Sequence, residues 1–331
     1  MAEICGQPDA LRRAGAALAA QDDRLVQLRD AIGSAGSVLF TGMGSSYDAC
    51  YPITTALAAR GVACSMLDTA ELLHFRLPML RPDTLVVCVS QSGESAELVR
   101  LVERLDAPRP RLAAITNGSQ NTLWRAADIA LDTAAGEEHG PSTMTFTAAL
   151  AVLDALLGDP PIERAALEME RLLADPHETA DQLCGWIDGR PQLALVGRGS
   201  ARAAAEMGAL TLKEAARFPA ESLQAAQFRH GPLELAGPAL AVMVVATEPA
   251  TRELELGLAG ELAAAGAAVL VASQDGDAAD GALPVTIGPL SGGLAAALAT
   301  VPAQLLAWRL ARSRGLEPGA FALAGKVTTR E

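Results

Sequence analysis

The stretch Thr84-Leu85-Val86-Val87-Cys88-Val89-Ser90-Gln91-Ser92-Gly93-Glu94-Ser95 decides the fold. An apolar run ends in a cluster of hydroxyl groups around one glycine, and a helical pattern follows from Ala96 to Leu105. This pattern is typical of a buried parallel strand whose carboxyl end opens into a ligand crevice. Backbone N–H groups and the dipole at a helix start favour a phosphate group there. The loop lacks the Gly-Lys-Ser/Thr ending of a nucleotide P-loop, so we expect a phosphorylated small molecule as the ligand.

Apolar runs of strand length recur along the chain, and helical patterns separate most of them. This alternation is typical of βαβ units and predicts parallel sheets. The predicted strands of the first half are Ser37–Thr41, Val62–Leu67, Thr84–Val89, Arg111–Thr116 and Asp128–Leu131, and those of the second half are Leu193–Val196, Ala239–Ala246, Ala267–Ala272 and Pro284–Ile287.

The spacing of these runs indicates an internal duplication. The offsets nearly agree, at 193 − 38 = 155, 239 − 84 = 155, 267 − 111 = 156 and 284 − 129 = 155. Each half opens with a strand that runs into Gly-x-Gly, at Gly42 and at Gly197, and each closes with a long alanine- and leucine-rich helix. The predicted fold class is therefore α/β, with two tandem doubly wound (flavodoxin-like) parallel-sheet domains. We place them at residues 20–160 and 180–331, after an N-terminal helical segment at 1–19.

The two copies are not equivalent at the phosphate loop. Shifting Ser90–Ser95 by 155 gives Val245-Ala246-Thr247-Glu248-Pro249-Ala250, in which the hydroxyl–glycine cluster is absent. Pro249 also lacks a backbone N–H to donate. We therefore expect one phosphate site in each chain, with the second domain contributing other groups.

The Gly-x-Gly turns could begin a dinucleotide fingerprint, but its third glycine is missing. That position is Tyr47 in the first half and Arg202 in the second. Two glycines of three favour a tight strand-to-helix turn over NAD binding, so no cofactor is expected. Ser45 and Ser46 extend the first turn with hydroxyl groups and could help to hold the phosphate.

Composition excludes several classes of protein. The chain has 331 residues and a net charge of −13, with 3% aromatic residues and no block of Lys and Arg, which argues against nucleic-acid and anionic-membrane partners. No apolar run reaches the length expected of a membrane span, and the N-terminus lacks the pattern of a secretion signal. Five cysteines without a CxxC pair indicate free thiols and a cytoplasmic location. We interpret Glu137, Glu138 and His139 as part of a substrate loop and expect no metal site.

Several motifs together resemble the double sugar-isomerase (SIS) domain family. The resemblance extends to the isomerase half of glucosamine-6-phosphate synthase and to SIS-type glucosamine-6-phosphate deaminases, and it covers nearly the whole chain. It rests on Glu3–Pro8, Gly44–Ala49, Ser90–Ser95, Ser142–Thr147, Gly208–Glu214, Phe228–Leu233 and Lys326–Thr329, in this order.

The resemblance implies a role for each matching residue. Glu214 would move a proton between C1 and C2, His230 would open the sugar ring across a homodimer interface, and Lys326 would lie in a tail that closes on the substrate. Ser46, Ser90, Gln91, Ser92 and Ser95 would bind the sugar phosphate, and Gly44, Ser45 and Ser142 would contact the sugar. Without the resemblance, Glu214 could be a solvated helix residue paired with Arg217, and His230 a surface histidine.

Departures from the family leave the reaction open. The sequence contains no match to the glutaminase domain of the synthase, so we do not expect glutamine-fed synthesis, and two lysines of the family are Thr211 and Met144 here. The expected reaction converts glucosamine 6-phosphate to fructose 6-phosphate and ammonia. The alternatives are a ketose–aldose phosphate isomerase or a deglycase on another sugar phosphate, and a non-catalytic phosphosugar-binding regulator.

Overall fold

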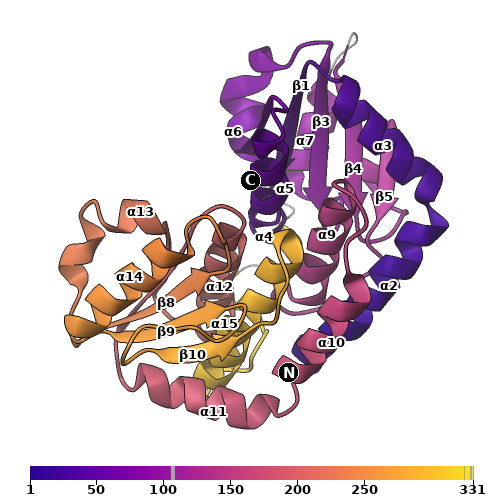
Figure 1. The fold of residues 1–331 in the computed structure, drawn as a ribbon. Helices are drawn as coiled ribbons and strands as arrows, with labels where there is room; N and C mark the ends of the chain where they lie inside the picture. The colour runs from indigo at the N-terminus through magenta and orange to yellow at the C-terminus, as the bar shows by residue number, and fades with distance from the viewer. Residues whose placement is uncertain (106–108, 324, 329, 331) are drawn as a thin grey trace.

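Two five-stranded parallel sheets form the frame of the protein in a computed structural model, which describes residues 1–105, 109–323, 325–328 and 330 (Figure 1). The strand orders are β2-β1-β3-β4-β5 and β7-β6-β8-β9-β10. The strands of the first sheet are β1 Ser37–Gly42, β2 Cys64–Asp68, β3 Thr84–Ser90, β4 Arg111–Thr116 and β5 Ile129–Asp132. Those of the second are β6 Gln192–Gly197, β7 Ala220–Gln224, β8 Leu240–Ala246, β9 Ala268–Ser273 and β10 Leu283–Thr286.

Helices cover both faces of each sheet. The first domain and the segment before it hold α1 Ala2–Cys5, α2 Gln7–Ala20, α3 Asp22–Ser34, α4 Ser45–Asp48, α5 Cys50–Ala59, α6 Thr69–Glu71, η1 Leu72–Arg76, η2 Leu77–Met79, α7 Ala96–Arg104, α8 Thr122–Ala126 and α9 Met144–Ala155. The rest of the chain holds α10 Ile162–Leu172, α11 Pro176–Ile187, α12 Ala201–Ala216, α13 Ala225–Phe228, η3 Pro232–Leu235, α14 Arg252–Ala264 and α15 Gly292–Ser313.

The predicted fold class is confirmed, and one strand was missed. All nine predicted strands are present, with ends within two residues of the prediction. The missed strand is β7, which lies at the sheet edge and reads Ala-Glu-Ser-Leu-Gln, with most side chains partly exposed. Such a strand lacks the apolar run by which the others were found. The duplication indicates this strand, because β7 begins 220 − 64 = 156 residues after β2, which agrees with the offset between the other pairs of equivalent strands.

The strand pairing also corrects the offset of the phosphate loop. Thr41 pairs with Cys88 in the first sheet, and Val196 pairs with Val244 in the second. The first strands are therefore 196 − 41 = 155 residues apart, but the next strands are 244 − 88 = 156 apart. The equivalent of Ser90–Ser95 is thus residues 246–251, one place later than the sequence-based shift.

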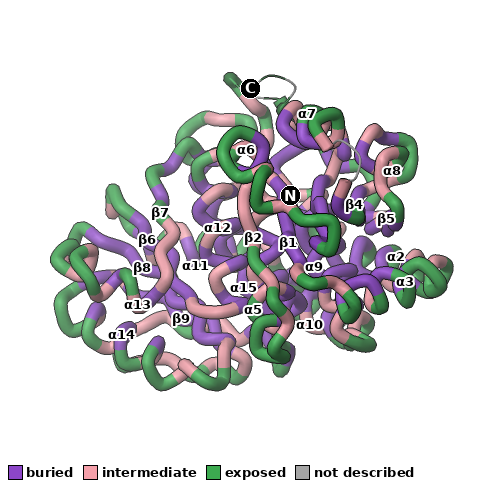
Figure 2. Tube along the Cα trace, turned by 90° about the horizontal axis from the view of Figure 1, so that it is seen from above, coloured by how far each residue is buried: buried purple, intermediate pink, exposed green. Residues whose placement is uncertain are grey.

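One hydrophobic core joins the two domains. Helices α9, α12 and α15 pack between the sheets, and the side chains of this layer form one cluster with residues of both sheets, such as Phe40 and Leu195 (Figure 2). The outer face of each sheet packs against a smaller cluster, which includes Leu101 in the first domain and Leu258 in the second. Central strands such as β8 are buried along their whole length, and their sequences are continuously apolar.

Helix α15 corrects the expectation about apolar runs. It has 22 residues and a mean hydropathy of 1.4 in its most apolar window, long and apolar enough by composition to cross a membrane. However, 89% of that window is buried inside the protein, where α15 packs against α12, α11 and α9. These contacts make it the central core helix of the fold.

Both chain ends pack against the domains. Gln7 in α2 donates a hydrogen bond from Nε2 to Gln304 of α15 at 2.8 Å, and Thr147 of α9 donates to Gln7 Oε1 at 2.8 Å. After α15 the chain returns to the first domain, where the carbonyl of Thr328 accepts a hydrogen bond from the N–H of Ala96 at the start of α7. The predicted limits 20–160 and 180–331 stay predictions. Thr329, in the closing motif, lies outside the described residues.

Candidate active site

A cavity of about 350 Å³ opens at the carboxyl edge of the first sheet. It lies where β1 and β3 are neighbours and the strand order reverses, which is the usual ligand site of doubly wound sheets. With the exception of His230, every predicted site residue lines it: Gly44, Ser45, Ser46, Ser90, Gln91, Ser92, Ser95, Ser142, Glu214 and Lys326.

The loop after β3 forms a cradle of hydroxyl groups. Ser90 Oγ accepts a hydrogen bond from the N–H of Gly93 at 3.0 Å, and Ser92 Oγ accepts one from the N–H of Glu94 at 3.1 Å. A hydroxyl that accepts in this way keeps its own proton for another acceptor. Ser95 is the N-cap of α7 but does not use its side chain to cap the helix. The cradle can therefore donate several hydrogen bonds to one anion.

Gly93 is required by the shape of this loop. Its φ is +63°, and a Cβ at this position would lie 2.1 Å from Oδ1 of Asn121. The loop is also tied to the next strand–helix connection, because the Glu94 carboxylate accepts hydrogen bonds from the N–H and the hydroxyl of Thr122 at 2.6 and 2.9 Å. These contacts fix the hydroxyl groups before any ligand arrives.

Glu214 approaches the cavity from the second domain, near the end of α12. Burial raises its pKa above the ordinary value; the positive charge of Lys326 opposes this shift, and the negative charge of Glu138 adds to it. A carboxyl group with a raised pKa is suited to both accepting and returning a proton near neutral pH. The alternative prediction, a solvated glutamate on the helix surface, is wrong, because Glu214 lines the cavity.

Lys326 reaches the cavity from the C-terminal segment. Its Nζ donates hydrogen bonds to Oε2 of Glu138 at 2.6 Å and to the carbonyl oxygen of Gly140 at 2.8 Å. The segment continues along the cavity to Thr328, whose carbonyl accepts a hydrogen bond from the N–H of Ala96 at 3.0 Å. The tail is thereby joined to the loop before α9 and to the first turn of α7.

Glu138 lies on the predicted substrate loop, but its role as the partner of Lys326 was not predicted. Its side chain is 0% exposed and also accepts hydrogen bonds from the N–H groups and hydroxyls of Thr143 and Thr145. An acidic residue shortly before a Ser-Thr helix start was the available signal. His139 instead points outward with Glu137, at an Nε2–Oε1 distance of 3.6 Å. Within the described ranges, no group of three or more His, Cys, Asp or Glu side chains could hold a metal ion.

The loop of Glu138 has two further supports. Glu3 of α1 accepts a hydrogen bond from the N–H of His139 at 2.6 Å, so the N-terminal segment backs the substrate side of the site. Ser142 Oγ accepts a hydrogen bond from Ser45 Oγ at 3.0 Å, which joins this loop to the turn after β1. The sugar-contacting residues predicted from the two motifs are therefore in direct contact.

Glu97 is a site residue that sequence reasoning missed. It lies in the first turn of α7, lines the cavity and is 6% exposed. Its Oε2 has no hydrogen-bond partner among the described residues. The ionisable side chains of the cavity lining are therefore Glu97, Glu214 and Lys326, so the phosphate cradle itself relies on hydroxyl and N–H groups.

His230 is not brought into the cavity of its own chain. It follows α13 at the edge of the second sheet, with an exposed side chain. Its predicted role across a dimer interface stays a prediction. The two positions where the family has lysine also stay outside the cavity lining. Thr211 is buried and donates from Oγ1 to the carbonyl of Met207 at 2.9 Å, and Met144 Sδ lies 4.0 Å from Nη2 of Arg13.

Proteins with several different named activities are similar to the chain. It is 28% identical over 345 residues to a glutamine–fructose-6-phosphate aminotransferase of Pyrobaculum aerophilum, a match that covers 99% of the chain and 57% of that protein. The chain thus spans about half the length of this relative. A tagatose-6-phosphate ketose/aldose isomerase from Escherichia coli has a similar fold, with a TM-score of 0.82, 22% identity and coverage of 96% of the chain and 93% of that structure.

A glucosamine-6-phosphate deaminase from Thermotoga maritima is another structural neighbour. Its TM-score is 0.71 at 22% identity, with coverage of 92% of the chain and 97% of that structure. The family model named SIS domain matches twice, at residues 31–158 and 187–313, which include the two sheets. The chain therefore belongs to the SIS-domain family and carries two SIS domains in tandem.

Proposed function

We propose that the protein isomerises an amino-hexose 6-phosphate and releases its amine, converting glucosamine 6-phosphate to fructose 6-phosphate and ammonia. The observation that carries this proposal is the single cavity in which a hydroxyl cradle faces Glu214 and Lys326. Relatives with printed aminotransferase, isomerase and deaminase names support a sugar phosphate as the substrate class.

The phosphate group binds the cradle after β3. Ser90, Ser92 and Ser95 donate hydrogen bonds to its oxygens, and the N-terminus of α7 contributes a favourable dipole. Ser46, on the turn after β1, and Gln91, on the loop after β3, line the same cavity. This arrangement directs the sugar carbons toward Glu214 and Lys326.

Glu214 moves the proton in the ring-opened sugar. Its carboxylate removes the proton from C2, the aldehyde oxygen on C1 takes a proton from solvent that is given back when the iminium is hydrolysed, and an enolamine forms. Glu214 then returns its proton to C1, so that C2 becomes an iminium carbon. Lys326 is held by Glu138 at 2.6 Å and supplies positive charge beside the developing oxyanion. Water adds to C2, and ammonia leaves as the C2 carbonyl forms, which balances the reaction.

Ring opening needs a group that exchanges a proton near neutral pH, and we assign it to His230. Because His230 is exposed and outside the cavity of its own chain, the proposal places it in a homodimer, where the partner supplies it. Five free cysteines fit the proposed cytoplasmic location. A chain that stays monomeric in solution while active would contradict the shared histidine.

An isomerase that releases no ammonia is the second candidate. Thr211 and Met144 take the place of family lysines, so Lys326 is the remaining amine of the described cavity lining. A deglycase on a related sugar phosphate needs the same proton transfer. A phosphosugar-binding regulator would not need Glu214 and Lys326 together in the cavity, and their presence favours an enzyme.

One assay separates these candidates. The protein is incubated with glucosamine 6-phosphate while ammonia and fructose 6-phosphate are measured, and in parallel with tagatose 6-phosphate and fructose 6-phosphate while isomer products are measured. Equal amounts of ammonia and fructose 6-phosphate support the deaminase. Isomer products without ammonia support the plain isomerase. Binding of a sugar phosphate with no turnover of any of them would leave the regulator.

A further inference from the structure

The second domain repeats the turn that forms one wall of the cavity in the first. Gly44 and Gly199 have nearly the same φ, +52° and +53°. A Cβ at Gly42 would lie 3.0 Å from the carbonyl carbon of Ser46, and a Cβ at Gly197 would lie 2.9 Å from that of Ala201. Both turns therefore bring a helix start against the end of a strand in the same way.

The opposite wall is repeated as well, with one exchanged residue. With the offset of 156 given by the strand pairing, Thr251 takes the place of Ser95, and the two residues are the N-caps of α14 and α7. With the same offset, Glu248 takes the place of Ser92. A hydroxyl of the phosphate cradle is thus replaced by a carboxylate in the second domain.

The Glu248 carboxylate fills the second crevice. Its Oε1 accepts a hydrogen bond from the N–H of Ser200 at 3.2 Å, and its Cδ lies 3.3 Å from the position that a Cβ of Gly199 would take. Ser200 is the N-cap of α12, a helix of 16 residues. An anion from the chain itself therefore rests on the turn and helix start that correspond to Ser45 in the first domain.

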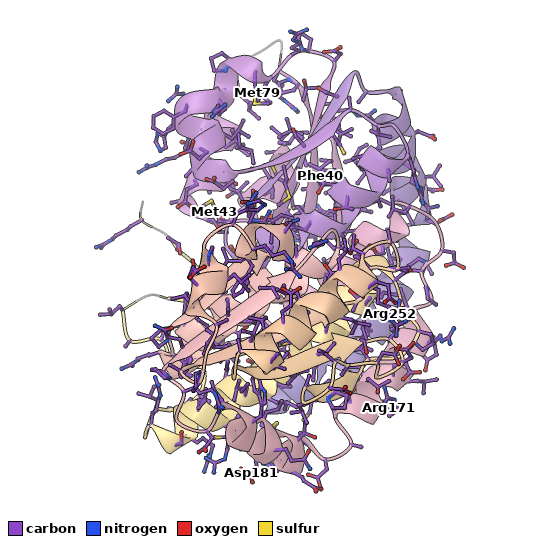
Figure 3. The ribbon with its side chains drawn as sticks, turned by 60° about the vertical axis from the view of Figure 1, so that its left-hand side comes forward. Phe40, Met43, Met79, Arg171, Asp181 and Arg252 are labelled. Carbon is purple, nitrogen blue, oxygen red and sulfur yellow. The ribbon has the colours of Figure 1, made fainter. Side chains whose placement is uncertain are left out.

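Two arginines and a threonine lie near this crevice. The Nε of Arg252 is buried with no hydrogen bond to any described residue, and Thr251 Oγ1 is buried beside the Glu255 carboxylate. The Nε of Arg198, which takes the place of Met43, lies 3.0 Å from Glu255 Oε1 without hydrogen-bond geometry. Glu255 is 1% exposed, and its carboxylate lies beside Arg198 and Thr251. The described lining of the first crevice contains no arginine, whereas Arg198 and Arg252 lie beside the second; Figure 3 labels Arg252 and also Met43, the residue of the first domain that corresponds to Arg198.

We propose that the second domain retains a site for a phosphate group and that the carboxylate of Glu248 occupies the position of the anion. The chain then binds one sugar phosphate because its second site is filled by its own side chain. Arg252 also forms ion pairs with Asp275 and Asp277. The inference uses the assignment of the first crevice as a phosphate site, but its test needs no turnover.

The experiment removes the carboxylate from the second site and removes two phosphate-binding hydroxyl groups from the first. Glu248→Ser restores the hydroxyl that Ser92 has in the first domain, in a full-length chain that also carries Ser90→Ala and Ser92→Ala. The probe is inorganic phosphate, compared with chloride at equal ionic strength. Glu253→Ser is the matched control, because Glu253 is an exposed residue of the first turn of α14 and its replacement removes the same charge.

The expected result is a gain of phosphate binding. In chloride the melting temperature of the Glu248→Ser chain falls below that of the Glu253→Ser chain, and phosphate restores it. Titration calorimetry then gives one phosphate per chain for Glu248→Ser and none for the control. Equal responses of the two chains to phosphate would overturn the proposal and leave Glu248 as a helix cap.

A second variant covers the case in which Glu248→Ser does not fold in either salt. Glu248→Gln keeps an oxygen that can accept from Ser200 N–H but removes the charge, and its control is Glu253→Gln. The proposal expects phosphate to raise the melting temperature of Glu248→Gln by more than that of the control. An equal rise in both would contradict it. If glucosamine 6-phosphate is not turned over by the unmodified protein, these binding results are unaffected.

Discussion

Lys326 Nζ and Glu138 Oε2 are 2.6 Å apart and join the C-terminal segment to the loop before α9, across 188 residues of sequence. Glu138 is fully buried, and Lys326 is 20% exposed. The pair thus places a positive charge at the cavity wall and keeps the tail over it. Removing one partner of a buried ion pair leaves the other charge without compensation.

Glu138→Gln is expected to lower the free energy of unfolding by about 3–5 kcal/mol, the usual cost of breaking a buried ion pair from one side. The carboxylate also accepts hydrogen bonds from Thr143 and Thr145, so the loss includes the start of α9. Urea unfolding measures the change. Glu137→Gln on the exposed neighbour is the control, and an equal loss in both variants would mean that the ion pair is not important.

The two lysines of the chain allow a chemical test of the tail, since the sequence contains no lysine besides Lys213 and Lys326. Lys213 is exposed, whereas Lys326 is mostly buried in its ion pair. Reductive methylation followed by mass spectrometry is expected to modify Lys213 first. Glucosamine 6-phosphate should slow the modification of Lys326 further and leave Lys213 unchanged. Equal rates at both lysines would show that the tail does not stay on the site.

Loss of hydroxyls from the cradle should weaken sugar-phosphate binding. Ser90→Ala and Ser92→Ala each remove a hydrogen bond to a charged group, expected to cost about 1.5–3 kcal/mol of binding free energy. The measurement is calorimetric titration with fructose 6-phosphate. Ser65→Ala, on the exposed side of β2, should bind like the unchanged protein. Unaltered affinity in both cradle variants would place the phosphate elsewhere.

The raised pKa of Glu214 predicts how activity depends on pH. Glu214 must be ionised to take a proton, so the acidic limb of the rate profile should lie above the ordinary range of a glutamate. Lys326 opposes the shift; its replacement, Lys326→Met, should therefore move the limb to higher pH.

Lys213→Met is the control for this profile, since Lys213 does not contribute to the shift of Glu214. Glu214→Gln should abolish exchange of the C2 proton with solvent while sugar-phosphate binding stays. If the acidic limb of the rate profile lies at the same pH in Lys326→Met and Lys213→Met, Lys326 does not influence the pKa of Glu214. Proton exchange retained in Glu214→Gln would remove Glu214 as the base.

Asp48 predicts a pH dependence of stability. It follows the turn after β1 in α4, which packs against α12, and burial followed by the charge of Glu206 raises its pKa to about 8. Because the folded-state pKa is raised, its contribution to stability is full below the ordinary value of 3.8 and is lost as the pH rises through about 8.

Asp48→Asn removes this titration. The variant should be more stable than the unchanged protein at pH 9, and the difference should shrink at pH 5; urea unfolding at the two pH values measures it. Asp30→Asn, on the surface helix α3, controls for the loss of one charge. A difference that does not change with pH would mean that Asp48 is ionised throughout the range.

Much of the frame follows from local patterns. The apolar runs predict nine strands because buried parallel strands are covered on both faces of the sheet. The hydroxyl–glycine cluster predicts the cradle because the groups that form the cradle lie within a few residues of one another in the sequence. β7 escapes this reasoning because an edge strand is partly exposed. Glu138 and Glu97 escape it because their roles come from contacts with the distant Lys326 and from burial at the cavity wall.

The sequence by itself determined the duplicated α/β frame, the turn glycines and the side chains of the cradle, since backbone conformation and strand burial act over short distances. The tertiary structure decided which groups meet. Packing around α15 and α12 brings Glu214 from the second domain to the cradle of the first, and the return of the tail brings Lys326 to Glu138. It also decided that Glu248 lies on the second turn, since strand pairing aligns it with Ser92 and its carboxylate accepts a hydrogen bond from the N–H of Ser200. Burial and the charge of a neighbouring side chain set the proton affinity of Glu214, and both arise only when the two domains pack together.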